Sequence, residues 1–190
     1  MAFLEERFVD MVGRYNHLPE SSIVVILYPM DDFHDVTQTP KWTGGLFDGK
    51  IRVPVGGVVA LNERLRRVLM HELTHAFVYS KTRGNCPTWL QEGLAQFEEG
   101  QRASSGTLYN LAKSYRTGLG TQWGEEMDYA AALALTEYLL ERYQLAALLE
   151  MLDRLRGGAS EDEAARHVLG KEMDAVLQDW GESLARRSAL

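Results

Sequence analysis

Apolar residues near the N-terminus follow first a helical and then an extended spacing. Residues 3–15 carry apolar side chains three and four positions apart, which predicts an opening amphipathic helix. The β-branched run SSIVVILY at 21–28 is the strongest strand signal in the chain. DDFHDV follows it and predicts a helical turn with Asp31 or Asp32 near the N-terminal cap.

The segment GGLFDGKIRVPV at 44–55 predicts a β-hairpin. Asp48-Gly49 separates its two apolar arms, and this pair tolerates the positive φ of a two-residue turn. Pro54 cannot donate a ladder hydrogen bond, so it ends the second arm or marks it as an edge strand.

From Asn62 onward the spacing is helical. Leu65, Leu69, Leu73 and Phe77 recur every four residues and form a stripe expected to face the core. The segment 128–155 predicts one or two helices with a break near Gln144.

Glycines and a capping pattern divide the C-terminal part. Gly157-Gly158 ends one helix, and Ser160 with Glu163 has the spacing of a capping box that starts the next. A last helix carries Met173, Val176, Leu177, Trp180 and Leu184. These patterns together predict an α+β fold, with a small mixed sheet near the N-terminus followed by a mostly helical half.

Composition narrows the class of protein. The 190 residues are 45 % hydrophobic and 25 % charged, as in an ordinary globular domain, and the net charge is −7. Basic residues are scattered apart from Arg64, Arg66 and Arg67, which we interpret as a solvated helix face; nucleic acid is therefore not an expected partner. The single Cys86 excludes an intrachain disulfide framework and a Cys-rich zinc site.

Targeting signals are not evident. The longest strongly apolar run, IVVIL at 23–27, is far too short for a membrane span. MAFLEERFVD has neither a basic nor a long apolar region, so we expect no secretory signal and a cytoplasmic protein if the chain is full length. The sequence specifies no oligomeric state.

HELTH at 71–75 is the first candidate for a metal-binding and catalytic motif. At about 100° per residue, His71 and His75 project within about 40° of each other, so both imidazoles can reach one cation. Glu72 is poorly placed as a further ligand but can reach a water on that metal, where a general base is needed.

PTWLQEGLA at 87–95 supplies a third ligand. Thr88 and Gln91 can cap a new helix after Pro87, and Glu92 then lies just inside that helix. His71, His75 and Glu92 make the open His₂Glu set of catalytic zinc sites. Glu99 lies two turns further on the same face and can accept the outer N–H of a liganding histidine.

Two other types of metal site do not fit the residues around HELTH. A metzincin needs glycine and histidine where Val78 and Lys81 stand, and a deformylase-like site needs a cysteine upstream of the histidines. A helix that merely carries two surface histidines is the remaining alternative, and the spacing of Glu92 argues against it.

HELTHAFV followed by PTWLQEGLAQFEE resembles the gluzincins, and WLQEGLAQF is similar to the Trp-Leu-x-Glu-Gly segment of their aminopeptidase branch. The closer resemblance is to small bacterial peptidase-MA-like domains. It extends over GLFDGKIRVPV, YAAALALTEYLLERY and GKEMDAVLQDW, and covers 23–184. It implies a thermolysin-like (zincin) fold, Zn²⁺ and peptide hydrolysis, with His71, His75 and Glu92 as ligands and Glu72 as base.

Two departures from the resemblance change the expectations. GGLFDGK lacks the glutamate with which aminopeptidases bind the substrate amine, so amino-terminal specificity is unsupported. Gln96 stands where thermolysin has an aspartate, and the outer histidine contact is therefore assigned to Glu99.

An oxyanion donor and the cleft walls are expected from later and earlier segments. Among Tyr109, Tyr115, Tyr129 and His167, we favour Tyr129 as the donor, with a packed tyrosine as the alternative. The hairpin is expected at the rim of the cleft, where an edge strand pairs with substrate. Trp42 is a candidate for lining the cleft, whereas Trp89 is expected in the core.

The expected protein is thus one zincin-like domain over 1–190. Residues 1–57 form an α/β part with the hairpin, 58–100 the metal-site helices and 101–190 a helical part. It is expected to be a zinc metallopeptidase that cuts a peptide or protein substrate internally. The alternative is a catalytically weak zinc-binding or scaffolding module, and either can be one domain of a larger protein.

Overall fold

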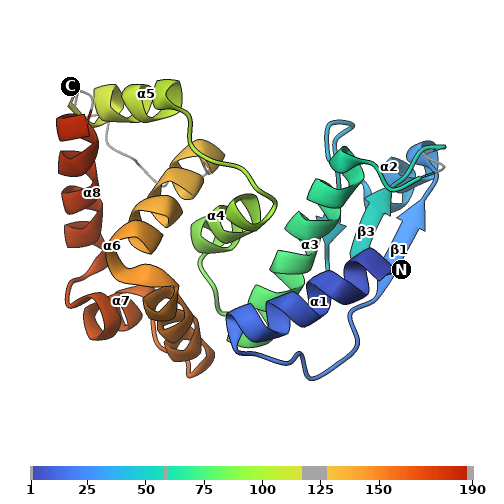
Figure 1. Ribbon diagram of the computed structural model, residues 1–190, viewed down its shortest axis with the longest axis horizontal. Coiled ribbons are helices and arrows are strands. Elements are labelled where there is room, and N and C mark those ends of the chain that lie inside the picture. Colours follow the sequence, from blue (N-terminus) through green and yellow to red (C-terminus); the bar gives the residue numbers. More distant parts are fainter. Residues whose placement is uncertain (1, 58–59, 117–127, 188–190) are drawn as a thin grey trace.

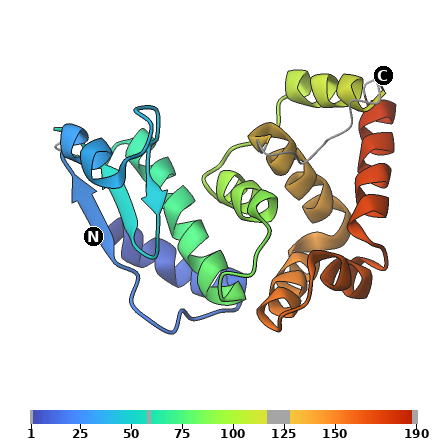
Figure 2. The same ribbon diagram turned by 180° about the vertical axis from the view of Figure 1, so that it is seen from behind.

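The computed structural model describes residues 2–57, 60–116 and 128–187, and these form eight helices and one three-stranded sheet. The predicted α+β class, with a small sheet and a mostly helical remainder, is therefore confirmed. The expected boundary at residue 58 lies outside the described residues. Figures 1 and 2 show a sheet-bearing half and a helical half, with α3 (Glu63–Thr82) and α4 (Thr88–Glu98) side by side between them.

The sheet-bearing half contains two helices and all three strands. These elements are α1 (Ala2–Tyr15), β1 (Val25–Tyr28), α2 (Met30–Thr37), β2 (Leu46–Phe47) and β3 (Ile51–Pro54). The sheet has the order β1-β3-β2, with β1 parallel and β2 antiparallel to β3. Helix α3 packs against β3 and α1 packs against α3. The opening helix and the strand within 21–28 are as predicted.

The hairpin differs from its prediction in two ways. Phe47 pairs with Ile51, so the turn has three residues rather than two. Gly49 takes φ 93°, and Asp48 binds Arg52 Nε at 2.9 Å, which favours this longer turn. Pro54 ends β3 as expected, but β3 is the central strand because β1 pairs along its other side. The edge strand is β2.

Of two predicted helix starts, the first is confirmed and the cap of the second is wrong. Asp31 and Asp32 lie near the N-terminal cap of α2, in its first turn, where they complement the helix dipole; Pro29 occupies the N-cap itself, without a side-chain bond. Pro87, not Thr88, occupies the N-cap of α4. The N–H groups of Leu90 and Gln91 both bond to the Pro87 carbonyl at 3.1 Å, so helical hydrogen bonding already begins before Thr88.

Helix α3 is fixed at its start and along its core face. The Asn62 side chain accepts the N–H of Leu65 at 2.9 Å, which caps the helix. Leu69, Leu73 and Phe77 are buried as the stripe predicted, and Leu65 is half-buried. Because this apolar stripe packs into the core, the opposite face of α3, which carries His71 and His75, keeps one orientation.

The helical half is built around α6 (Tyr129–Arg156). Gln144 has φ 68° and ψ 164° inside this helix, which confirms the predicted break. The remaining helices are α5 (Ser105–Arg116), α7 (Glu161–Leu169) and α8 (Met173–Arg187). The Ser160–Glu163 capping box is present, and Trp89 is buried as expected. No helix in the described part of the chain is long and apolar enough to span a membrane.

Gly93 lets α4 and α6 pack closely. A β-carbon at Gly93 would lie 2.0 Å from Thr136 Oγ1 and 2.5 Å from the Ala132 carbonyl oxygen. Since both are far below van der Waals separation, the glycine of QEGLA is required by this helix crossing. The crossing in turn sets the position of Glu92, the preceding residue.

Gly93→Ala is expected to destabilise the protein by about 1–3 kcal/mol through overpacking. Gly13→Ala in α1 is the matched control, because nothing lies within 4 Å of its added β-carbon. It should be neutral or stabilising by up to about 1 kcal/mol, from helix propensity. Urea unfolding monitored by circular dichroism measures both. Equal stability of the two variants would contradict the close packing at Gly93.

Candidate metal centre

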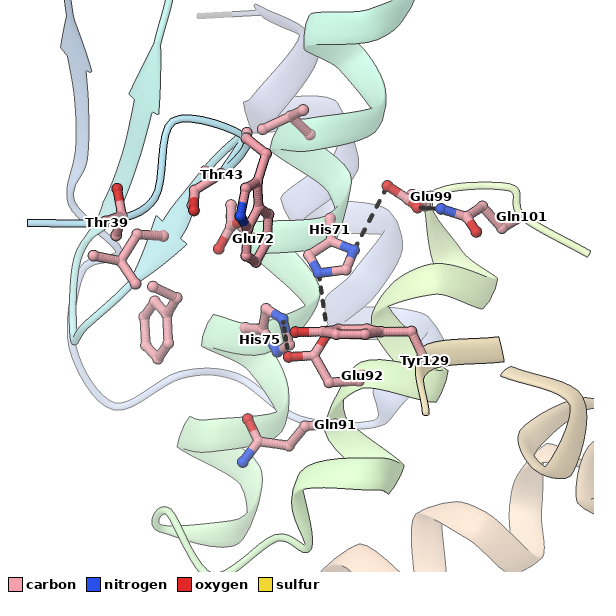
Figure 3. Close-up of a pocket in the computed structure, with 16 residues that line it drawn as sticks. Thr39, Thr43, His71, Glu72, His75, Gln91, Glu92, Glu99, Gln101 and Tyr129 are labelled. Carbon is pink, nitrogen blue, oxygen red and sulfur yellow. Dashed lines mark hydrogen bonds and ion pairs between the residues drawn. The ribbon is translucent and has the colours of Figure 1, made fainter. Parts of the chain in front are cut away.

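Two adjoining helices bring the three predicted ligands together. His71 and His75 lie one turn apart on α3, with ring centroids 4.7 Å apart, and Glu92 faces them from α4. One ligand atom from each of the three residues lies within 4.8 Å of the other two. Figure 3 shows the Glu92 carboxylate directed at both imidazoles. The arrangement can hold one metal ion.

The distances in this cluster match those around a tetrahedral ion. His71 Nε2 lies 3.4 Å from Glu92 Oε2, and His75 Nε2 lies 3.6 Å from Glu92 Oε1. Ligand atoms about 2.0–2.2 Å from a tetrahedral zinc ion would be about 3.3–3.6 Å apart. Glu92 Oε2 is buried and makes no hydrogen bond, an arrangement that costs free energy unless a cation satisfies it. The residues present therefore fit a divalent ion.

Glu99 faces the other nitrogen of His71. Its Oε2 lies 3.6 Å from His71 Nδ1, and its Oε1 accepts a hydrogen bond from the Gln101 amide. When an ion is bound, a carboxylate on the Nδ1 side would favour the neutral imidazole form whose Nε2 lone pair is free to bind that ion. This is the contact expected from the seven-residue spacing of Glu92 and Glu99.

The two histidines differ in protonation. Burial disfavours the charged form of His71, but the Glu92 and Glu99 carboxylates, 3.4 and 3.6 Å from its ring nitrogens, outweigh this effect and raise its pKa to about 10. Burial dominates at His75 and lowers its pKa to about 4. Without an ion, the pair thus carries about one positive charge at neutral pH, from the extra proton on His71. A bound metal replaces that proton as the positive charge between the carboxylates.

Glu72 lies beside the cluster and is 5 % exposed. Burial, reinforced by the charges of Glu92 and Glu99 and opposed by His71, raises its pKa to about 7. Its carboxylate is close to the chain before β2: a β-carbon at Gly45 would lie 2.6 Å from Glu72 Oε1. A carboxylate with a pKa near neutrality can both accept and return a proton.

A cleft of about 680 Å³ opens over these residues. The predicted hairpin lies at its rim, because residues 42–47 line one wall together with Val68. The other wall consists of side chains from α4, the chain after it and the start of α6, and comprises Gln91, Glu92, Glu99, Gln101 and Tyr129. Trp42 lines the cleft, as the sequence suggested.

Tyr129 is the first residue of α6 and is 51 % exposed. Figure 3 shows its side chain pointing into the cleft on the side of Glu92. Partial burial and the Glu92 charge raise the pKa of its hydroxyl. Gln96 donates from its side-chain amide to the Tyr129 carbonyl at 3.0 Å, so the residue that replaces the expected aspartate connects α4 to α6.

The other candidates lie outside the cleft. Tyr109 is 57 % exposed on α5, and the Tyr115 hydroxyl donates to the Gln178 carbonyl at 3.5 Å. His167 is exposed beside Arg154. The two remaining histidines lie elsewhere: His17 Nε2 is 2.9 Å from Ser80 Oγ, and His34 Nδ1 is 3.4 Å from Thr39 Oγ1.

Three residues of the cleft were not singled out from the sequence. Val68 lies one turn before His71 and contributes to the apolar wall, Gln101 binds Glu99, and Gly45 makes room for Glu72. The Gly44-Gly45 pair was a visible signal, but its contact with Glu72 depends on how the hairpin folds over α3. The roles of Val68 and Gln101 had no local sequence signal.

The comparisons agree with this geometry. Neither a curated protein nor a solved structure shows a significant match to the chain. The family model of the Peptidase MA superfamily matches residues 19–186, which include both helices of the site and most of the cleft. The chain belongs to the Peptidase MA superfamily.

Proposed function

We propose that this protein is a zinc-dependent metallopeptidase that hydrolyses peptide bonds. The observation that carries the proposal is the convergence of His71, His75 and Glu92 within 4.8 Å, around a buried carboxylate oxygen that makes no hydrogen bond. The proposal includes a thermolysin-like arrangement of one domain over 1–190. In it, residues 1–57 provide the hairpin, 58–100 the ligands and 101–190 the supporting helices.

The ligand set and Glu72 divide the chemistry between them. A bound zinc ion would supply Lewis-acid polarisation of the scissile carbonyl and would make water a stronger acid. Glu72 accepts the proton of the attacking water and delivers it to the leaving amine as the peptide C–N bond breaks. Its raised pKa suits both transfers. Burial of Glu72 beneath Gly45 keeps competing water away from the carboxylate.

Tyr129 is proposed as the hydrogen-bond donor to the developing oxyanion. Its hydroxyl lies in the cleft near Glu92, and its main chain is held by Gln96. Tyr129→Phe should lower kcat by about 10²-fold with little change in KM, since the bond forms only in the transition state. Steady-state kinetics on one peptide test this. An equal fall in the metal content of the variant would instead indicate a structural role.

The edge strand β2 is proposed to bind the substrate main chain. It has two residues, Leu46 and Phe47, and among the described strands β3 alone pairs with it, along one side. Its free side is available for an extended peptide that adds to the sheet next to the metal ligands. Binding through the main chain would hold a substrate of varied sequence across the cleft.

Metal removal tests the proposed function. Purified protein with one equivalent of zinc should cleave an unstructured protein such as casein, and a chelator such as 1,10-phenanthroline should abolish that cleavage. Adding zinc back should restore it, because the ligands remain folded on α3 and α4. The non-chelating isomer 1,7-phenanthroline is the matched control. Cleavage that persists in the metal-free protein would refute a zinc-dependent mechanism.

A further inference from the structure

We infer that the cleft selects an internal stretch of peptide chain with an uncharged, apolar side chain next to the scissile bond, rather than a chain terminus. This inference rests on the proposed function and specifies its substrate class. It follows from the charges on the cleft walls, from an apolar patch near the metal ligands and from the geometry of β2.

The cleft offers no lysine or arginine to a terminal carboxylate. None of the described residues that line it is lysine or arginine. The segments outside the described residues, which are 1, 58–59, 117–127 and 188–190, contain neither residue in their sequence. A free C-terminal carboxylate is normally bound by arginine or lysine through charge-assisted hydrogen bonds. Such a terminus would find neither of these side chains in this cleft.

The carboxylates among the described residues that line the cleft already have neighbours within the site. Glu92 faces both histidines, Glu99 faces His71 Nδ1, and Glu72 lies beneath Gly45. A free substrate amine would therefore compete with the metal site for each of them. Three carboxylates also outnumber the two charges of a divalent ion, so the cleft repels acidic side chains and a terminal carboxylate.

An apolar patch covers the wall opposite Glu92. Trp42, Leu46, Phe47 and Val68 all line the cleft, and Trp42 is 80 % exposed. A tryptophan left this exposed at the rim of a cleft is a large apolar surface that a bound ligand can cover. The patch is contributed by the loop before β2, by β2 itself and by α3. It therefore lies within reach of a side chain adjacent to the bond being cut.

The main chain of β2 adds no preference for chain ends. Strand addition uses amide and carbonyl groups that every internal residue carries. The cleft thus provides both groups that recognition of an internal segment requires: a strand edge for its backbone and an apolar patch for one side chain.

The test compares peptides of one length that differ at one feature. One peptide has Ala-Leu at its centre and a second has Ala-Asp; each is made with free ends and with acetyl and amide caps. With the zinc-loaded protein, capping should change kcat/KM of the Ala-Leu peptide by less than about 3-fold. Replacing the central leucine of the peptide by aspartate should lower kcat/KM by about 10²-fold, which is the discrimination expected from one side chain.

Trp42 is assigned as the specificity-determining residue of this site. Trp42→Ala should raise KM for the Ala-Leu peptide about 10-fold at unchanged kcat, and Trp42→Phe should restore most of the loss. Tyr109→Ala, which removes an exposed aromatic side chain on α5, is the matched control and should change neither constant. A fall in kcat alone for Trp42→Ala would contradict the assignment.

Calorimetric binding of the same peptides to zinc-loaded Glu72→Gln protein separates this inference from the proposed function. If the wild type cleaves nothing, yet the variant binds capped Ala-Leu peptide more tightly than Ala-Asp, the substrate class stands and the peptidase proposal fails. Loss of cleavage on capping either end overturns the inference and keeps the peptidase. Absence of binding to every peptide at millimolar concentration also overturns it.

Discussion

Glu92→Gln is expected to abolish stoichiometric zinc binding and, with it, all peptide cleavage. The substitution keeps the size of the side chain but removes the one carboxylate among the described residues that faces both His71 and His75. Loss of an outer contact to a ligand typically weakens metal binding 10–100-fold. Loss of a direct ligand should therefore cost at least about 100-fold, or about 2.7 kcal/mol. Metal content after gel filtration measures the effect.

The stability of the Glu92→Gln protein adds a second readout. Wild-type protein should gain about 2.7 kcal/mol when free zinc is at 100 times its dissociation constant, and the variant should gain far less. In the absence of metal the two proteins should differ less in stability than they do with zinc. The substitution removes the repulsion of Glu72 by Glu92, but it also removes the carboxylate that faces the charged His71.

Glu98→Gln is the matched control for Glu92→Gln. It makes the same chemical change on the same helix, but Glu98 faces Arg14 Nε at 2.7 Å instead of the histidines. This variant should retain one equivalent of zinc and its activity, even if the loss of the ion pair lowers its unfolding temperature. Undiminished zinc in Glu92→Gln would exclude the proposed ligand set.

Glu72→Gln should lower kcat/KM by about 10²–10⁴-fold while zinc stays bound. A glutamine amide cannot accept the proton of the attacking water, and Glu72 is not one of the three clustered ligands. The substitution is nearly isosteric, so the contact beneath Gly45 should persist. Kinetics on a fluorogenic peptide, paired with metal analysis of the same sample, give both quantities.

The result for Glu72→Gln also separates peptidase from binding module. Full zinc content with cleavage lost only in the variant supports the enzyme. If zinc-loaded wild type and variant are equally inactive on every peptide, the alternative of a catalytically weak binding or scaffolding module is favoured. Activity retained in Glu72→Gln would mean that another group serves as the base.

The metal cluster could be predicted from the sequence because its parts follow local rules. His71 and His75 share a face through helical periodicity alone, and the stripe of Leu69, Leu73 and Phe77 on another face fixes that helix against the core. Glu99 falls toward His71 by the same periodicity, counted from Glu92. The Ser160–Glu163 capping box and the break at Gln144 are likewise local features.

The errors lie where two local choices have similar free energies. Asp48-Gly49 is compatible with a two-residue or a three-residue turn, and pairing of Phe47 with Ile51 selects the longer one. Pro54 suits the end of an edge or a central strand, and the parallel pairing of β1 with β3 makes β3 central. Thr88 and Pro87 both suit the start of a helix, and the hydrogen bonds to the Pro87 carbonyl decide between them.

Helical periodicity in the sequence sufficed to place His71 and His75 on one face and to mark Glu92 as the third residue of the candidate metal cluster. Long-range packing set the position of α4 and the surroundings of all three side chains. Burial that raises the pKa of Glu72, the contact of Gly45 with Glu72 and the exposure of Trp42 at the rim all arise between segments distant along the chain. Periodicity acts over a few residues, whereas electrostatic environment and cleft shape depend on every segment packed around the site.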